Sequence, residues 1–143
     1  AWLYDGDSPA DSDLPTDLRD YAGALELDFP VRIDVVSTGS SAERASGELA
    51  AAAREAMLNA ARHAGGDVSV YIEGAASAVE VFIRDRGDGF DPADVPADRW
   101  GVRESIVGRM RRAGGTAVIR SGAGVRGTEV RLSVPTTAAA RRG

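Results

Sequence analysis

One short stretch of the chain, REAMLNAARHAGG, carries side chains that could act together on a metal-bound phosphate. It holds the only Asn and the only His of the sequence, Asn59 and His63, together with Glu55 and Arg62. In a helix, with its turn of about 100° per residue, these four side chains fall within a sector of roughly 100°. A carboxylate can act as a base, an amide oxygen can bind Mg²⁺, and the two basic groups can bind phosphate oxygens. The alternative is an ordinary solvated flank of the helix, and the residue types alone leave both interpretations open.

A second group of residues, in FIRDRGDGFDP, follows an apolar strand. Apolar residues alternate along this strand up to Ile83, and the same alternation puts Asp85 on their buried side. A buried carboxylate is costly unless donors satisfy it, and the exocyclic amine of a ligand would do so. Gly87 and Gly89 permit a tight turn and the close approach of a ligand. The alternative is a surface turn in which Asp85 bonds to its own backbone.

Two further positions could complete such a site. Gly101 precedes an expected helix, where backbone N–H groups can meet a phosphate. Thr128 follows Gly127 at the start of the last expected strand, and its hydroxyl could join the pocket of Asp85. Taken alone, each of these features is more typical of a simple turn than of a ligand site.

The hydrophobic pattern predicts the scaffold that positions these residues. Ser40 and Glu43 form a capping box at the start of the long helix, and Gly65-Gly66 ends it. A Pro-punctuated loop spans Asp85 to about Trp100. The order of the elements predicts helices layered on one face of a mixed sheet, an α+β two-layer sandwich. The expected helices span about 16–26, 40–64 and 102–113, and the expected strands 31–39, 67–74, 78–85, 116–121 and 128–135.

Composition narrows the class of protein. The 143 residues suffice for one domain with a substantial core. The net charge of −5 argues against a general nucleic-acid or anionic-membrane surface. There is no Cys, and no apolar run approaches the roughly 20 residues of a membrane span, so we expect a cytosolic chain. The opening AWLYDGD has no initiator Met, which suggests a piece of a longer protein.

The order and spacing of the motifs resemble one known family. A helix carries Glu-x-x-x-Asn-Ala-x-x-His-Ala, and a hairpin, Asp-x-Gly-x-Gly-Phe, a Gly-bearing helix start and a terminal Gly-Thr strand follow. Over residues 16–135 this pattern resembles the Bergerat-fold (GHKL) ATP-binding domain of gyrase, heat-shock chaperones, histidine kinases and mismatch-repair proteins. It is most similar to the catalytic domain of bacterial sensor histidine kinases, and VPADRWGVRESIVGRM resembles their actinobacterial members.

The resemblance implies roles for the polar residues of the long helix. Glu55 matches the carboxylate that acts as a base or polarises the attacking group, and Asn59 matches the Mg²⁺-binding Asn. Arg62 and His63 match a basic pair that faces the phosphates. The implied cofactors are therefore ATP and Mg²⁺.

The resemblance also implies an adenine pocket. Asp85 matches the carboxylate that accepts the adenine amino group, and Gly87 and Gly89 match the loop beneath the base. Thr128 matches a hydroxyl near adenine that acts through water.

The segment that resembles the lid over the nucleotide departs from the family pattern. Gly101 matches a lid glycine, where relatives often carry two or more. Ser105 lies where a second glycine is common, so the contacts of the lid with the nucleotide stay open.

A histidine kinase also needs a phosphoacceptor His, and the only His of the chain belongs to the helix of the ATP site. The resemblance thus implies a catalytic fragment that donates the γ-phosphoryl group of Mg-ATP to a His on a separate dimerisation domain. We expect residues 1–15 to be the linker from that domain, 16–135 the ATP-binding domain and 136–143 a disordered tail. The fragment would be a monomer, and the full-length protein a homodimeric, membrane-bound sensor with a cytoplasmic catalytic domain and a response regulator downstream.

Two alternative functions remain open at this point. A stand-alone serine kinase of the anti-sigma-factor type has the same fold, and a start Met and a sigma-binding surface would favour it. A nucleotide-sensing module without phosphotransfer is the other alternative. Glu55 argues against that module, because binding alone requires no base.

Overall fold

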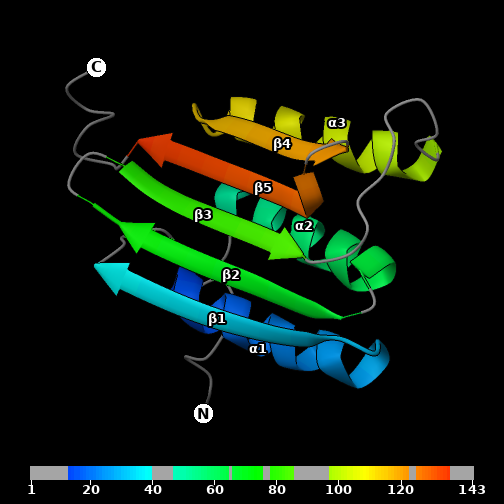
Figure 1. The fold of residues 1–143 in the computed structure, drawn as a ribbon. Coiled ribbons are helices and arrows are strands. Elements are labelled where there is room, and N and C mark those ends of the chain that lie inside the picture. The colour runs from blue at the N-terminus through cyan, green and yellow to red at the C-terminus, as the bar shows by residue number, and fades with distance from the viewer. Residues whose placement is uncertain are drawn as a thin grey trace, which may run out of the picture.

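The computed structural model describes most of the chain, and in this part three helices cover one face of a five-stranded sheet (Figure 1). None of the described helices lies on the opposite face of the sheet (Figure 1). This arrangement confirms the expected α+β two-layer sandwich. The described residues are 13–39, 47–64, 66–75, 78–85, 97–122 and 125–135.

The sheet is mixed, with the strand order β1-β2-β3-β5-β4. β1 pairs with β2 in parallel, and every other neighbouring pair is antiparallel. A parallel pair needs a crossover connection, which helix α2 supplies. The strands are β1 (Arg32–Gly39), β2 (Asp67–Gly74), β3 (Ala78–Asp85), β4 (Thr116–Gly122) and β5 (Val125–Pro135).

Helix α1 (Leu14–Asp28) begins two residues earlier and ends two residues later than the sequence predicts. Asp13 caps it, because its side chain accepts a hydrogen bond from the Thr16 N–H at 2.9 Å. The expected linker and tail, residues 1–15 and 136–143, lie outside the described residues except for residues 13–15.

Helix α2 (Glu48–Ala64) is shorter than the predicted helix, which was expected to begin at Ser40. Gly47 lies in a bend ahead of the helix, and its carbonyl accepts the Ala51 N–H at 3.1 Å. Glycine loses more backbone entropy than any other residue inside a helix, which favours a boundary at this position. The expected capping box of Ser40 and Glu43 lies outside the described residues.

Helix α3 (Ala97–Arg112) begins earlier than predicted, so the loop from Asp85 does not extend to Trp100. Gly101 consequently lies inside the helix and not ahead of it, which corrects the prediction of a helix start there. Three arginines in the last turn suit the negative end of the helix dipole. Gly114, with φ of +78°, ends the helix as predicted.

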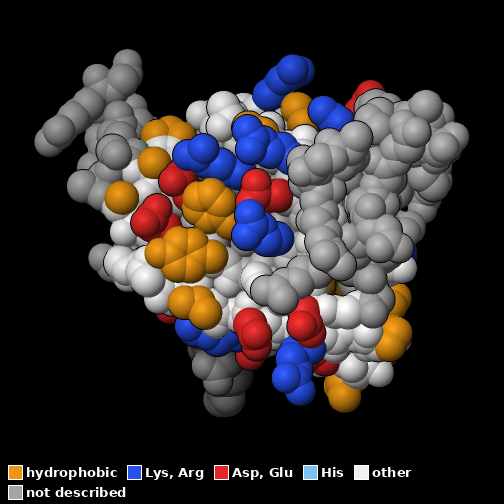
Figure 2. All heavy atoms as spheres, in the orientation of Figure 1, with side chains coloured by type: hydrophobic (Ala, Val, Ile, Leu, Met, Phe, Trp, Pro, Cys, Tyr) orange, Lys and Arg blue, Asp and Glu red, His pale blue; other side chains and the backbone are white. Residues whose placement is uncertain are grey.

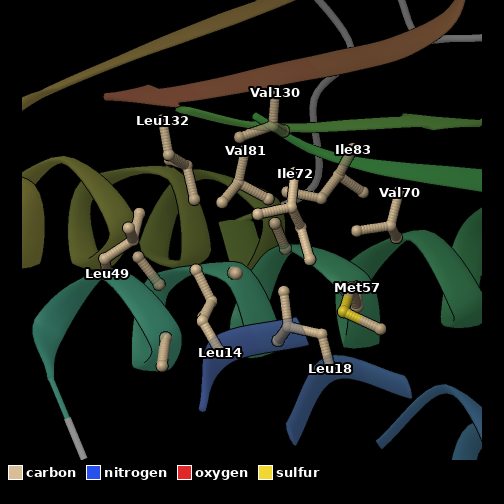
Figure 3. Packing of buried hydrophobic residues seen from close by; sticks show 14 of the residues in the cluster. Leu14, Leu18, Leu49, Met57, Val70, Ile72, Val81, Ile83, Val130 and Leu132 are labelled. Atoms are coloured by element: carbon tan, nitrogen blue, oxygen red, sulfur yellow. The ribbon is translucent and has the colours of Figure 1, made fainter. Parts of the chain in front are cut away.

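The core lies between the helices and the inward face of the sheet (Figure 3). Helix α2 is central and packs against β2, β3 and β5, while α1 covers β1 and α3 covers β4 and β5. Leu49 and Met57 of α2 meet the inward-facing residues of the strands (Figure 3). The buried hydrophobic residues of the strands are Ile33, Val68, Val70, Ile72, Val79, Val81, Ile83, Val130, Leu132 and Val134.

The uncovered face of the sheet carries mixed charges and aromatic rings (Figure 2). Arg131 pairs with Glu80 at 2.7 Å, and its guanidinium lies 5.6 Å from the centre of the Phe82 ring. Arg84 pairs with Glu129 at 3.0 Å. In the described ranges, no helix combines the length and the apolar character needed to span a membrane.

Candidate active site

Asp85 is a buried carboxylate at the end of β3. Only 5% of the residue is exposed, as the strand alternation predicts. Its Oδ1 accepts a hydrogen bond from the backbone N–H of Thr128 at 3.1 Å. A donor on β5, 43 residues away, therefore helps to satisfy the charge that burial would otherwise make costly.

Gly127 makes the close approach of β5 to Asp85 possible. Its φ is +82°, and a Cβ built there would lie 2.0 Å from the carbonyl oxygen of Asp85. The same Cβ would lie 3.0 Å from Oδ1 of Asp85. The residue that follows, Thr128, is 6% exposed, so its side chain belongs to the same buried corner. The Gly-Thr pair was identified in the sequence, but the steric need for glycine was missed because it depends on how β5 pairs with β3.

The polar residues of α2 border its buried alanine face. Glu55 and Asn59 are half-buried and lie one turn apart, next to the buried Ala56 and Ala60. Arg62 is exposed in the last turn. His63 belongs to the same turn of α2 by its backbone, and its side chain lies outside what the structure describes.

The topology brings Asp85 and the end of α2 to the same end of the sheet (Figure 1). Helix α2 ends at Ala64 and β2 begins at Asp67. In the antiparallel pairing of β2 with β3, Val68 lies opposite Asp85. The last two turns of α2, which carry Asn59, therefore approach the end of β3 that carries Asp85.

Helix α3 runs antiparallel to α2, and its N-terminal part points to the same end. Ser105 meets Glu55, whereas Arg112, near the C-terminus of α3, meets Glu48 in the first turn of α2. Gly101 lies one turn before Ser105 and so on the side of the site. Gly87 and Gly89 lie outside the described residues.

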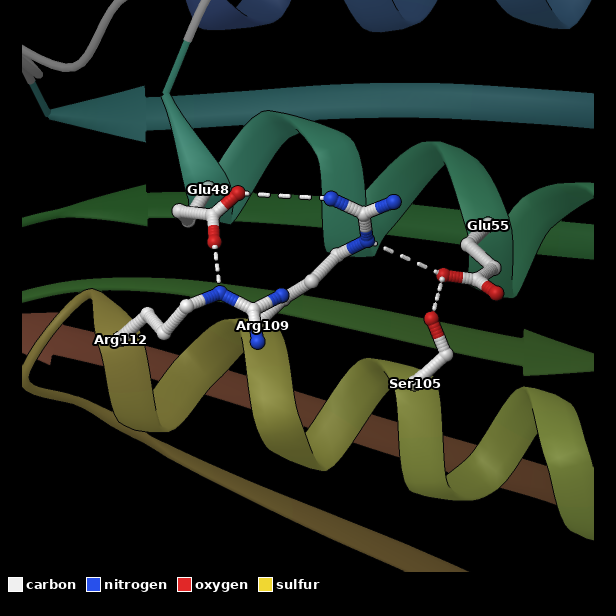
Figure 4. Close-up of polar contacts among 5 residues, drawn as sticks. All are labelled: Glu48, Glu55, Ser105, Arg109 and Arg112. Carbon is white, nitrogen blue, oxygen red and sulfur yellow. Dashed lines mark hydrogen bonds and ion pairs between the residues drawn. The ribbon is translucent and has the colours of Figure 1, made fainter.

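A polar cluster joins α2 to α3 beside the site (Figure 4). The Ser105 hydroxyl donates to Oε1 of Glu55 at 2.9 Å, and Arg109 Nε donates to the same oxygen at 3.3 Å. Arg109 Nη1 also reaches Oε1 of Glu48 at 3.4 Å. The sequence analysis missed these partners of Glu55. The signal that could have indicated them is a polar stripe on α3, in which Ser105, Arg109 and Arg112 are spaced four and three residues apart.

The second carboxylate of this cluster, Glu48, is held by two arginines. Arg112 Nε donates to its Oε2 at 2.7 Å, and this hydrogen bond is the main reason that the pKa of Glu48 lies below its ordinary value. The charges of Arg112 and Arg109 act in the same direction. Glu48 therefore carries its negative charge to lower pH than a free glutamate does.

A candidate ligand for a metal ion lies on helix α2. Within the described ranges, no three His, Cys, Asp or Glu side chains gather in a way that could hold one. The half-buried amide of Asn59 offers one oxygen at the edge of α2. Mg²⁺ keeps several waters and commonly takes one or two protein ligands together with substrate phosphates, so such an oxygen fits a nucleotide-borne Mg²⁺.

The comparison with protein families agrees with this geometry. The histidine kinase-like ATPase domain family matches residues 32–132, and the chain belongs to this family. Membership in an ATPase domain family assigns ATP as the ligand. No curated protein sequence matches the chain.

Solved structures of histidine kinases share the fold. The blue-light activated histidine kinase of Erythrobacter litoralis EL346 superposes with a TM-score of 0.66 at 18% identity, over 89% of this chain and 46% of that one. The mycobacterial sensor histidine kinase MprB gives 0.62 at 18% identity, over 86% of this chain and 93% of that one. The Acinetobacter baumannii histidine kinase AdeS gives 0.70 at 12% identity, over 88% of this chain and 66% of that one. The chain thus spans about half the length of the Erythrobacter protein.

Proposed function

We propose that this chain is the ATP-binding catalytic domain of a two-component sensor histidine kinase. It binds Mg-ATP and donates the γ-phosphoryl group to a His on a separate dimerisation domain. The observation that carries the proposal is the buried carboxylate of Asp85, located at the same end of the sheet as Asn59 of α2. Membership in the histidine kinase-like ATPase domain family supports it.

In this proposal the buried corner at the end of β3 recognises adenine. Asp85 accepts a hydrogen bond from the adenine amino group, and the Thr128 hydroxyl contributes through water. Gly87 and Gly89 form the loop beneath the base. The burial of Asp85 and Thr128 supports this role, because a carboxylate in a dry pocket discriminates strongly between a donor and an acceptor on the ligand.

The α2 side of the site handles the triphosphate in this proposal. Asn59 is a ligand of Mg²⁺, which neutralises charge on the phosphates. Arg62 and His63 bind phosphate oxygens, and Gly101 belongs to the lid that closes over them. Glu55 acts as the base or polarises the attacking group. Its half-buried position one turn before Asn59 supports this role, because a base must lie within reach of the reacting group.

The acceptor and the partners follow from the same assignment. The proposed acceptor is a His on the dimerisation domain of the same kinase, and a response regulator receives the phosphoryl group next. The catalytic domain would be monomeric by itself and would lie on the cytoplasmic side of a membrane-bound, homodimeric sensor. Phosphoryl transfer depends mainly on in-line positioning, so the acceptor has to be delivered to the γ-phosphate by that second domain.

Incubation with γ-labelled ATP tests the proposal. The chain alone should bind Mg-ATP, hydrolyse it slowly at most and acquire no label on His. Adding the dimerisation segment as a separate polypeptide should give acid-labile label on that segment. Glu55→Ala should greatly slow this transfer. Acid-labile label on the chain alone, or no transfer to any supplied segment, would contradict the proposal.

The metal assignment has its own test. Asn59→Ala should weaken ATP binding by about tenfold, or roughly 1.4 kcal/mol, when Mg²⁺ is present. Binding of ADP without metal should stay near the wild-type value. Titrations with and without Mg²⁺ measure both, and an equal loss in the two conditions would make Asn59 a structural residue.

A further inference from the structure

The carboxylate of Glu55 is held by side chains of another helix. Ser105 Oγ donates to Oε1 at 2.9 Å, and Arg109 Nε donates to the same oxygen at 3.3 Å (Figure 4). Neither bond uses the other oxygen, Oε2. The Glu55 side chain keeps 25% of its surface exposed, so it is both anchored and accessible.

Arg109 is placed to hold Glu55 in a defined direction. Its Nε binds Glu55 while its Nη1 lies 3.4 Å from Oε1 of Glu48, two turns away on α2. A guanidinium held at two of its nitrogens has little freedom to rotate, because its donors form a rigid planar fork. Ser105 lies one turn before Arg109 and adds a second donor from another side of Oε1.

We propose that Ser105 and Arg109 are positioning residues for Glu55 in the phosphoryl transfer, and this inference rests on the proposed function. By binding Oε1 they fix the rotamer of Glu55 and leave Oε2 for the reacting group. A base acts only within hydrogen-bond reach of the proton that it takes. A displacement of about 1 Å can cost a reaction about a hundredfold. Ser105 supplies this donor at a position where a glycine could not.

The test separates the rate of transfer from the affinity for nucleotide. Ser105→Ala and Arg109→Gln should each lower the transfer rate at saturating Mg-ATP by about ten- to a hundredfold. The Kd for ATP should change by less than about twofold, because neither residue contacts adenine in the proposed site. Ser105→Thr keeps the hydroxyl and should restore most of the rate. The rate is measured by transfer of label from γ-labelled ATP to the separately supplied dimerisation segment.

Arg112→Gln is the matched control. Arg112 also joins α3 to α2, through Glu48, but it makes no contact with Glu55 in the described structure. This variant should keep the wild-type rate. Thermal unfolding of every variant checks the fold, and alanine at position 105 favours a helix.

Three results would overturn the inference. The first is a wild-type transfer rate in both Ser105→Ala and Arg109→Gln. The second is a loss of rate in Arg112→Gln as large as theirs, and either result would make the cluster only a tether between helices. The third is a Ser105→Thr variant that is as slow as Ser105→Ala. By contrast, a wild-type chain that binds ATP but transfers nothing to the supplied segment would refute the proposed function itself.

Discussion

The two carboxylates of the site, Asp85 and Glu55, are held in opposite ways. Asp85 is 5% exposed and accepts a hydrogen bond from the backbone of β5, which the sheet fixes in place. The Glu55 side chain is 25% exposed and is held by two side chains of α3. A backbone donor within a sheet is fixed by the surrounding ladder, whereas the serine and arginine donors depend on the rotamers of their own side chains.

This difference matches the two tasks proposed for the site. Recognition of a flat base is helped by a site that stays the same with and without ligand, and in the proposal the paired strands β3 and β5 form it. A group that takes part in a reaction needs a defined orientation, and in the proposal Ser105 and Arg109 supply it for Glu55. Losing the partner of a buried charge is costly, while exposed ion pairs contribute little each. Changes around Asp85 should therefore lower the stability of the fold more than changes around Glu55 and Glu48 do.

The largest effect is expected from Gly127→Ala, which places a methyl group against the backbone of Asp85. Its Cβ would lie 2.0 Å from the Asp85 carbonyl oxygen, so β5 would have to withdraw from β3. We expect a loss of about 3 kcal/mol or more in the free energy of unfolding, together with loss of ATP binding. Urea unfolding and ATP titration measure the two losses.

Gly114→Ala is the matched control for this substitution. Gly114 also has a positive φ, of +78°, but a Cβ there would meet nothing within 4 Å. Only the backbone penalty of about 1–2 kcal/mol should appear, with ATP binding retained. Equal effects of the two substitutions would show that crowding at Asp85 is unimportant.

Asp85→Asn should have the next largest effect, and it should fall on affinity. The Asn carbonyl oxygen can still accept the Thr128 N–H, so the fold should survive. Loss of the charged acceptor should weaken ATP binding by about 1.5–3 kcal/mol and reduce the preference for ATP over GTP. Titration calorimetry measures both. Asp34→Asn, on the exposed side of β1, makes the same change of charge and should leave binding unchanged.

The smallest effect is expected in the polar cluster between α2 and α3, from Glu48→Gln. The pKa of Glu48 is lowered in the folded chain, mainly by the hydrogen bond from Arg112, so the carboxylate stabilises the fold above its unfolded pKa. This contribution is lost as the pH falls through the lowered pKa. Wild type should therefore unfold at a slightly higher Tm than Glu48→Gln at about pH 7, and the difference should shrink as the pH falls below about 4, the ordinary pKa of a glutamate. A difference in Tm that grows on acidification would contradict this account of the ion pair between Glu48 and Arg112.

The sequence was informative where the pattern is local. Strict alternation along β3 predicted the burial of Asp85, and the spacing of four between Glu55 and Asn59 predicted their common edge on α2. Local signals also misled at two helix starts, because the sequence predicted one unbroken helix over 40–64 and another from about Val102. The structure instead begins α2 after Gly47 and α3 at Ala97.

Contacts between distant elements were beyond the sequence. The bond from Ser105 to Glu55 joins residues 50 positions apart, and no periodicity says which helix a polar stripe will meet. The need for glycine at position 127 depends in the same way on the pairing of β3 with β5. The residue types of the site were therefore predictable, but the partners that hold them were not.

The connection from β3 to α3, residues 86–96, has a consequence for how this fold can vary. Both of its ends are anchored, at Asp85 in the sheet and at Ala97 in the helix. For a loop between fixed ends, the entropy of closure grows only with the logarithm of the loop length, so each doubling of length costs about 0.6 kcal/mol. Insertions here are thermodynamically cheap beside the 3 kcal/mol or so expected for a single methyl group at Gly127. A change of length between these two anchors should therefore disturb the fold less than a change in the paired strands that hold Asp85.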